Sequence, residues 1–420
     1  MHLGILFFFL FSSFDCLAQA DSIPIYKGGV QANRDKMYAN ITKNIITKNL
    51  YLSLSDSTEE NWEDAFYAME VLCYKPYWVS ENVNTAFDGI EKRSAGFQRA
   101  LLEFCYAMYP SDFTAAVQTL ASTTGNSKIF ALCTEYLYQA NKITSNSIAT
   151  RTKMFQFEME QDSILNPLVK SKWKVTDNDK AAALHEICTK TFLPNNVVLF
   201  SFQRKNRNYP GMVVVRNKEG NFVIDDSSNI IALPQLARSV SNLPYYLTNG
   251  NTPQGIFRMF GFAVSKSMAI GPTTNIQLSM PLETSPQFFL KDSTLTDTVW
   301  TEALYQKLLP PSWKKYLPAL ETYYASKAGR TEIIAHGTTV DPAFYKGQPY
   351  YPYTPTQGCL CTKELWSTTD GKRLISDQQK LVDAVTKAGG PDGYLVVIEI
   401  DDQQKPISVN DILPYIKTKE

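Results

Sequence analysis

The segment Leu193-Pro194-Asn195-Asn196, followed by Val197-Val198-Leu199-Phe200-Ser201-Phe202, separates two halves of the chain that differ in hydrophobic periodicity. Before it, apolar residues recur at helical spacing. After it, short runs rich in β-branched and aromatic residues alternate with turns. Pro-Asn-Asn favours a turn between the two patterns. The sequence therefore predicts an α+β multidomain chain, with an all-α helical domain at residues 21–193 and a mainly β domain with helical insertions at residues 194–420.

The N-terminal half is predicted to consist of helices joined by short polar turns. Ser57-Thr58-Glu59-Glu60 has the pattern of a capping box that opens a helix, and Pro76 is expected to stop that helix. Further helices are predicted at residues 97–108, 113–121, 129–141 and 179–191. Both a small helical bundle and a HEAT-like stack fit this pattern, because no clean repeat consensus decides between them.

The C-terminal half is predicted to contain short strands with inserted helices. Strands are predicted at residues 197–202, 212–215, 222–224, 257–262, 276–280, 333–335 and 394–400. Helices are predicted at 300–308, 313–326 and 376–387, the last one ended by Gly389-Gly390. The C-terminal half is therefore predicted to be a strand-rich module with inserted helices.

Two motifs in this half carry residues suited to nucleophilic catalysis, namely Ala335-His336-Gly337-Thr338 and Thr356-Gln357-Gly358-Cys359. A thiolate attacks carbonyl carbon well, but a free thiol is mostly protonated at neutral pH and needs a base. His336 can supply that base. The other histidine beyond the N-terminus, His185, lies in a predicted helix and is interpreted as a partly buried structural residue. Gly358 lets a backbone N–H approach an oxyanion closely.

Together with Thr252-Pro253-Gln254-Gly255-Ile256-Phe257, these motifs resemble the catalytic domain of the YkuD-type L,D-transpeptidases. That family carries a TPxGxF-like segment, then His-Gly-Thr, then Ser/Thr-x-Gly-Cys followed by an apolar residue and Arg. The three motifs occur in this order, and the resemblance covers residues 195–401, about half of the chain. The chain departs from the family at Cys361, where Arg is usual, and at Gln357, where His or Lys is common. The 23 positions between His336 and Cys359 also exceed the usual spacing.

The resemblance implies a β-sandwich-like catalytic domain and thiol chemistry on peptidoglycan stem peptides. It assigns Cys359 as the nucleophile and His336 as the general base that later protonates the leaving amine. A backbone carbonyl near Gly337 would orient the imidazole, and the Gly358 and Cys359 N–H groups would bind the oxyanion. The remaining candidates for the substrate cleft are Thr338, Thr356, Gln357 and Tyr353.

The implied reaction is attack of Cys359 on a stem-peptide carbonyl at an L,D-bond, with release of the terminal D-amino acid. An amine of a neighbouring stem would then resolve the thioester and form a cross-link, whereas water would give L,D-carboxypeptidase chemistry. Neither a metal nor an organic cofactor is expected. A non-catalytic wall-binding or scaffold module is the alternative, with the helical domain as a candidate for binding a protein partner.

Three features near the motifs leave more than one interpretation open. Lys363 and Arg330 are the nearby cations that could replace the missing Arg, but each is interpreted as a solvated surface residue. The segment Pro349-Tyr350-Tyr351-Pro352-Tyr353-Thr354-Pro355 suits a lid or groove wall as well as a rigid surface loop. Cys361 is interpreted as a packed small residue rather than a second reactive thiol.

Composition excludes some classes of protein and suggests a compartment. The 41 Lys and Arg residues balance 41 Asp and Glu residues, so no net field favours nucleic acid or a membrane surface. Residues 1–20 combine a short apolar run with Ala18-Gln19-Ala20, the pattern of a cleaved secretory signal. We therefore expect an exported protein of the bacterial cell envelope, with the periplasm as its compartment.

Export permits disulfides, and the four cysteines of the N-terminal half allow three pairings. No cysteine pair has zinc-site spacing.

Overall fold

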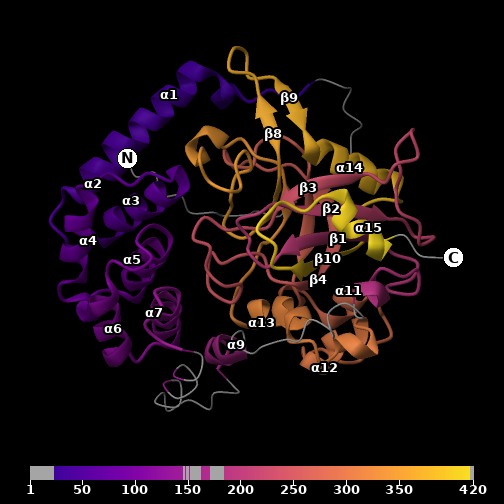
Figure 1. Ribbon diagram of the computed structural model, residues 1–420, viewed down its shortest axis with the longest axis horizontal. Coiled ribbons are helices and arrows are strands. Elements are labelled where there is room, and N and C mark those ends of the chain that lie inside the picture. The colour runs from indigo at the N-terminus through magenta and orange to yellow at the C-terminus, as the bar shows by residue number, and fades with distance from the viewer. Residues whose placement is uncertain (1–22, 145–146, 148–150, 152–161, 171–183, 417–420) are drawn as a thin grey trace.

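The computed structural model describes residues 23–144, 147, 151, 162–170 and 184–416, and shows a layer of helices beside a strand-rich module (Figure 1). The expected signal peptide at residues 1–20 lies outside these ranges, as does the first part of the helix predicted at 179–191. None of the helices in the described ranges combines the length and the apolar character that crossing a membrane requires.

The N-terminal half is helical, as predicted. Its helices are α1 (Gln31–Asn40), a π-helical turn (Ile41–Thr47), α2 (Lys48–Leu50), α3 (Glu59–Leu72), α4 (Val79–Phe87), α5 (Ala95–Met108), α6 (Thr114–Thr123), α7 (Ser127–Gln139) and α9 (Leu165–Lys170). Phe66 of α3 stacks on Phe104 of α5 with ring centroids 4.9 Å apart, at the centre of a continuous apolar core. The helices from α2 onward share this core, whereas α1 has no buried residue.

The ends of α3 differ from the predicted ones. Thr58 occupies the N-cap position, but its hydroxyl donates to the Ser53 carbonyl at 2.8 Å and makes no cap hydrogen bond to the helix, so the predicted capping box is wrong. At the other end, Cys73 adopts a left-handed conformation with φ 47° and ends the helix before Pro76 is reached.

The C-terminal half is built on a closed barrel of eight strands. The strands are β1 (Val197–Arg204), β2 (Gly211–Arg216), β3 (Ala232–Leu236), β4 (Gly255–Ala263), β5 (Asn275–Ser279), β6 (Ala335–His336), β7 (Leu360–Thr362) and β10 (Gly393–Asp401), in the order β1-β10-β4-β5-β6-β7-β3-β2. The expected sandwich is therefore wrong. The short strand β7 pairs with β6 on one side and β3 on the other, which closes the eight strands into one barrel instead of two stacked sheets.

Both faces of the central strands are covered, which explains their nearly unbroken apolar sequences. Alternate residues of β1 and β10, such as Leu199 and Leu395, belong to one apolar cluster together with α14 (Asp377–Lys387). The intervening residues, such as Phe200 and Val396, pack under four outer helices. These are α11 (Pro286–Leu290), α12 (Glu302–Tyr305), α13 (Glu321–Lys327) and α15 (Val409–Ile416).

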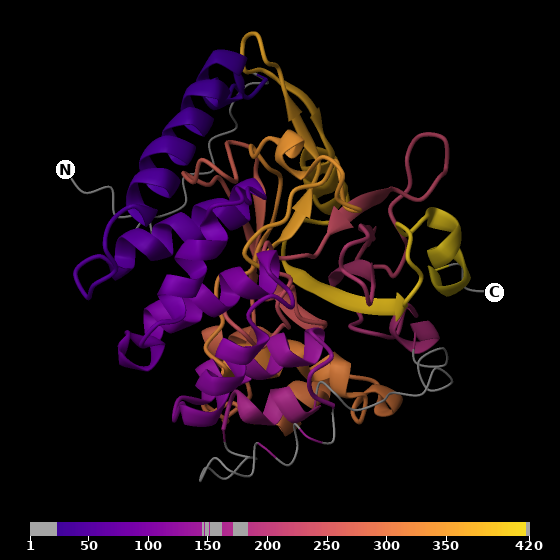
Figure 2. The same cartoon turned by 60° about the vertical axis from the view of Figure 1, so that its left-hand side comes forward.

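A two-stranded sheet of β8 (Glu364–Trp366) and β9 (Arg373–Ser376) projects from the barrel toward α1 (Figures 1 and 2). The backbone N–H of Tyr26, which precedes α1, donates to the Gly371 carbonyl at 2.8 Å. This hydrogen bond joins the start of the helical half to the C-terminal half of the chain.

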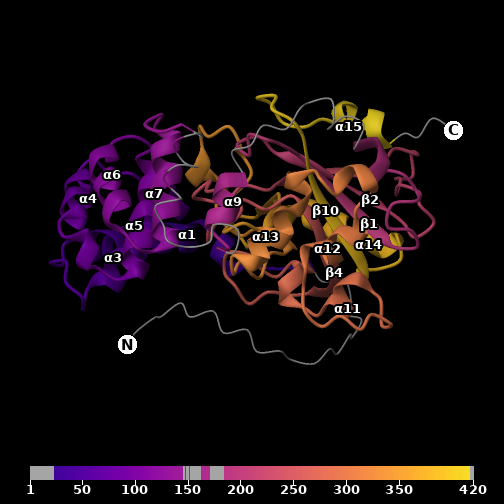
Figure 3. The same ribbon diagram turned by 90° about the horizontal axis from the view of Figure 1, so that it is seen from below.

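The helical layer packs directly against one side of the barrel module, as the view from below also shows (Figure 3). Leu243 and Leu247 of the C-terminal half belong to the core of the helical half. Tyr246 donates a hydrogen bond to Glu135 of α7 at 2.7 Å, and Tyr345 donates to the Val71 carbonyl of α3 at 2.6 Å. Conversely, residues just before the proposed boundary, such as Phe192, pack in the barrel's cluster. The boundary at 193/194 stays an interpretation.

Candidate active site

Strands β6 and β7 bring the two candidate catalytic motifs side by side. Ala335 pairs with Leu360 and His336 pairs with Cys361 in a parallel register. Ala335 and Leu360 lie in the barrel core, so strand alternation directs His336 and Cys361 to the other face. Cys359 comes immediately before β7, one step from this pair. The topology thus places the candidate nucleophile and base on neighbouring chain segments.

The His336 imidazole is buried and held by its own motif. Its Nδ1 hydrogen-bonds the carbonyl of Gly337, the position expected to orient the ring. A carbonyl accepts only, so Nδ1 carries the proton and Nε2 is left unprotonated. Burial lowers the pKa of His336 to about 4, while the bond to Gly337 opposes that shift. His336 is therefore a neutral imidazole at pH 7, and no hydrogen bond from the described residues reaches its Nε2.

The turn before Cys359 is fixed by two threonine hydroxyls. Thr356 accepts from the Gly358 N–H at 3.0 Å and donates to the Cys359 carbonyl at 2.9 Å. Thr252, from the upstream motif, donates to the Gly358 carbonyl at 2.8 Å. The Gly358 N–H is therefore not free for an oxyanion, contrary to the expectation. Within the described chain the Cys359 N–H has no hydrogen-bond partner, so it is the available donor.

The Cys359 thiol is half-buried and lies against the segment that leads into β6. Its Sγ accepts from the Ile334 N–H at 3.5 Å and donates to the Glu332 carbonyl at 3.6 Å. Burial raises the pKa of Cys359 to about 11, while the Ile334 N–H and the Arg330 charge act in the opposite direction. In the described part of the chain no hydrogen bond joins Sγ to His336.

Arg330 is the residue whose position differs most from expectation. Its side chain is only 7 % exposed, so the interpretation as a solvated surface residue is wrong. Its guanidinium donates to the carbonyls of Asn251 at 2.7 Å and Gly250 at 2.8 Å. A Cβ on Gly358, whose φ is 115°, would overlap Arg330 Nη2. No carboxylate of the described residues forms an ion pair with Arg330, which leaves a buried cation beside the Cys359 turn.

Glu364, which belongs to none of the motifs in the sequence, hydrogen-bonds the segment that follows His336. Its carboxylate accepts from the Thr338 N–H at 3.0 Å and from the Thr273 hydroxyl at 2.6 Å. A Cβ on Gly337 would overlap this carboxylate, so glycine is needed there for space. Burial raises the pKa of Glu364. The signal in the sequence was a lone acidic residue in a strand-like run just after the cysteine motif.

The other predicted cleft residues have different environments. Thr338 is buried and accepts a hydrogen bond from Thr354 at 2.9 Å, which gives it a structural role. Gln357 is exposed and Tyr353 is half-buried. Cys361 is buried with its Sγ 3.6 Å from the Thr354 hydroxyl, as expected for a packed small residue.

The proline- and tyrosine-rich segment between the motifs is anchored rather than detached. The Tyr350 side chain is buried, and the Arg238 guanidinium lies 4.6 Å from its ring centroid. Tyr345, just upstream, packs against the same ring. These contacts favour the rigid loop over the lid. Lys363 is half-buried, and His185 is exposed rather than partly buried.

The six cysteines of the described residues are all unpaired, and no group of three or more His, Cys, Asp or Glu residues there could hold a metal ion.

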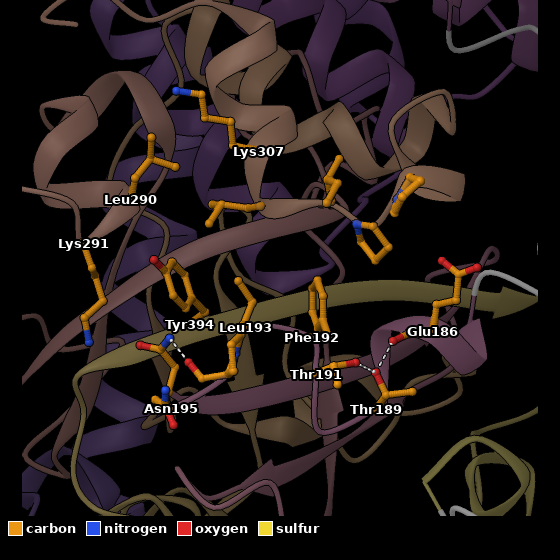
Figure 4. Close-up of a pocket in the computed structure, with 16 residues that line it drawn as sticks. Glu186, Thr189, Thr191, Phe192, Leu193, Asn195, Leu290, Lys291, Lys307 and Tyr394 are labelled. Carbon is orange, nitrogen blue, oxygen red and sulfur yellow. Dashed lines mark hydrogen bonds between the residues drawn. The ribbon is translucent and has the colours of Figure 1, made fainter. Parts of the chain in front are cut away.

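A pocket of about 800 Å³ lies elsewhere on the module (Figure 4), lined by Asn195, Lys291, Lys307 and Tyr394 among others. It shares no residue with the motifs around His336 and Cys359.

Comparisons of the chain with protein-family models, with curated proteins and with solved structures find no match. The function of the chain is therefore inferred from the chemistry of the Cys359 region and from the motifs that compose it.

Proposed function

We propose that this protein is a cysteine-dependent acyltransferase with an L,D-transpeptidase-like catalytic domain, acting on peptidoglycan stem peptides in the bacterial cell envelope. The observation that carries the proposal is the arrangement around Cys359. A half-buried thiol follows a tightly held glycine turn, a buried guanidinium lies against that turn, and a neutral imidazole with an oriented Nδ1 lies on the next strand. These are the parts that thiol acyl transfer needs.

In the first half-reaction the Cys359 Sγ–H gives its proton to His336 Nε2 as Sγ attacks a stem-peptide carbonyl carbon. The proton passes directly once the substrate is bound, or through one water, because Sγ and the imidazole are not hydrogen-bonded in the free protein. The Cys359 N–H and the Arg330 charge stabilise the resulting oxyanion. Collapse breaks the C–N bond, and His336 protonates the leaving amine of the terminal D-amino acid.

In the second half-reaction an acceptor attacks the thioester and releases the Cys359 thiolate. An amine of a neighbouring stem forms a cross-link, which is transpeptidation. Water as the acceptor gives the free acid, which is the carboxypeptidase outcome. Both use the same residues, so the acceptor decides between them.

A non-catalytic wall-binding module is the second candidate. The observations that favour it are the pKa of Cys359, which burial raises to about 11, and the missing hydrogen bond between Sγ and His336. A protein of this kind would bind stem peptides without forming a thioester.

Release of D-alanine from a purified disaccharide tetrapeptide distinguishes the two candidates. The unsubstituted protein should release it, Cys359→Ala should not, and the matched control Cys361→Ala should retain activity because that buried thiol contacts no expected reacting atom. Binding without release in the unsubstituted protein would establish the wall-binding module instead.

A further inference from the structure

Glu364 of β8 is a buried carboxyl group that the acyl-transfer steps above do not use. Its residue is only 2 % exposed. Oε2 accepts a hydrogen bond from the Thr338 N–H at 3.0 Å. Oε1 accepts from the Thr273 hydroxyl at 2.6 Å and from the Ser376 hydroxyl at 2.5 Å. Burying a carboxylate is costly unless donors satisfy its oxygens, and here both oxygens have donors.

The two hydroxyls approach Glu364 as donors. Thr273 accepts from the Arg373 guanidinium at 3.1 Å, and Ser376 accepts from the Gln379 N–H at 2.8 Å. Because an N–H already engages each hydroxyl oxygen, the hydroxyl proton is directed to the carboxyl group. Burial raises the pKa of Glu364, whereas the hydrogen bonds from Ser376 and Thr273 and the Arg373 charge lower it. Three donors around one carboxyl group fit its ionised form.

The peptide group between Gly337 and Thr338 lies between Glu364 and His336. Its N–H, from Thr338, donates to Glu364 Oε2, and its carbonyl, from Gly337, accepts from His336 Nδ1. A Cβ on Gly337 would overlap Glu364 Oε2, so this approach needs glycine. Hydrogen bonds in a chain polarise one another. A carboxylate on the N–H therefore makes the carbonyl a stronger acceptor for the imidazole.

Trp366, two residues further along β8, holds the same segment without a charge. Its Nε1–H donates to the Thr338 carbonyl at 2.8 Å. That carbonyl belongs to the next peptide group, which has no part in the chain from Glu364 to His336. Anchoring of the segment and polarisation of the Gly337 carbonyl therefore come from two different side chains, which can be substituted separately.

We propose that Glu364 is a positioning residue for the general base, which it orients and makes more basic through the Gly337–Thr338 peptide group. This inference rests on the thiol acyl transfer proposed above. When Cys359 gives its proton to His336 Nε2, the imidazole becomes cationic and its Nδ1–H bond to the polarised carbonyl strengthens. The proton then leaves with the amine, so Glu364 gains no proton in the cycle.

The charged groups around Glu364 do not obscure its effect. Arg373 of β9 and Cys361 of β7 interact with it electrostatically. An arginine stays protonated, and burial raises the pKa of Cys361 to about 12, so neither changes charge near neutral pH. Asp377 of α14, next to Ser376, forms an ion pair with a lysine of its own helix at 2.9 Å. Burial lowers the pKa of His336, and its bond to Gly337 opposes this.

The pH profile of acylation by a carbapenem tests the role of Glu364. Its low-pH limb marks the protonation of His336, which removes the base. Glu364→Gln keeps the shape of the side chain and removes its charge. We expect the limb to move about one pH unit lower, because the imidazolium loses a favourable charge. The rate at pH 7 should fall about tenfold, and the Nδ1–H proton resonance of His336 should move upfield as its hydrogen bond weakens.

Trp366→Phe is the matched control, because it removes a hydrogen bond to Thr338 but no charge. Its low-pH limb and its His336 Nδ1–H resonance should equal those of the unsubstituted protein. A shift in this variant as large as in Glu364→Gln would reduce Glu364 to an anchor of the loop. An unchanged limb and resonance in Glu364→Gln would overturn its role and leave the acyl transfer standing. No adduct in the unsubstituted protein would overturn both.

A measurement on the unsubstituted protein keeps the proposal testable if Glu364→Gln does not fold. The side-chain carboxyl carbon of Glu364 reports its titration by NMR. The Thr338 amide proton and the His336 Nδ1–H proton should both shift with that same midpoint, because one peptide group joins them. A His336 resonance that does not respond at this midpoint would overturn the polarisation through the peptide.

Discussion

Arg330 contributes both hydrogen bonds and positive charge at the turn that carries Cys359. Its guanidinium satisfies backbone carbonyls some eighty residues away in sequence and brings positive charge to the turn of a thiol that burial keeps protonated. Desolvation also lowers the pKa of Arg330 to about 10, which is still well above neutrality, so the group stays charged. A buried cation without an ion-pair partner among the described residues costs stability. In the acyl transfer that we propose, its charge would stabilise the oxyanion.

Replacing Arg330 therefore has a measurable effect on the thiol. In Arg330→Met the pKa of Cys359 should rise further, because the nearby cation that lowers it is lost. The rate of iodoacetamide labelling as a function of pH measures this shift. Lys363→Met is the matched control and should leave the labelling profile unchanged. A profile for Arg330→Met that matches the unsubstituted protein would show that the guanidinium serves only the loop carbonyls.

His336 and His185 give opposite predictions. His336→Ala should slow acylation of Cys359 by about 10²–10⁴-fold, because general-base assistance is lost. His185→Ala should leave acylation unchanged, since His185 is exposed and far from both motifs in the chain. Stopped-flow measurement of acylation by a carbapenem distinguishes the two. Equal rates in the two variants would remove His336 from the mechanism.

The elements that sequence patterns predict well are those with long, regular periodicity. Helices such as α5 and strands such as β1 and β10 repeat their apolar residues over many positions. Strand β3 was missed because Pro234 and Gln235 interrupt its apolar run, and β7 was missed because it has only three residues. Closure into a barrel depends on these two, so the architecture could not be predicted from local periodicity.

The residues of the candidate site could also be predicted only in part from the sequence. The motifs identified Cys359, His336 and the Gly337 carbonyl from adjacent residues. The burial of Arg330 comes from contacts with a segment about eighty residues earlier in the chain, and a polar residue in a loop-like stretch gives no local sign of such contacts.

Burial of Glu103 on α5 makes stability depend on pH, because desolvation raises the pKa of this carboxyl group. Its folded pKa of about 7 lies above the ordinary glutamate value, so its protonated form favours the fold. The contribution is complete below the ordinary value and is lost as the pH rises through 7. Glu103→Gln should therefore raise Tm at pH 8 relative to the unsubstituted protein, by an amount equivalent to roughly 1 kcal/mol or more. At pH 4 the two should melt together. A lower Tm for the variant at pH 8 would contradict the direction of this shift.

The helical half and the barrel module share buried apolar contacts. Leu247 of the barrel module is fully buried in the core of the helical half, and the segment before residue 194 packs on the barrel. We therefore expect one cooperative unfolding transition, seen at the same temperature by far-UV circular dichroism and by tryptophan fluorescence. Two separated transitions would mean that the halves are stable independently.

A single substitution at the contact tests the same coupling. Leu247→Ala should lower the free energy of unfolding of the entire chain by about 2–5 kcal/mol, because it leaves a cavity between the halves. Leu374→Ala, at a residue that is 65 % exposed, is the control and should change stability by less than about 0.5 kcal/mol. Loss of helical signal alone in the Leu247 variant would show that the barrel does not depend on the helices.

The most direct test of the central claim is the intact mass of the protein after incubation with a carbapenem. We expect one covalent adduct on the unsubstituted chain, mapped to Cys359 by peptide sequencing. The adduct should be present in Cys361→Ala and absent from Cys359→Ala. An adduct of the same yield in Cys359→Ala, or none in the unsubstituted protein, would contradict the assignment of Cys359 as an acyl-accepting nucleophile.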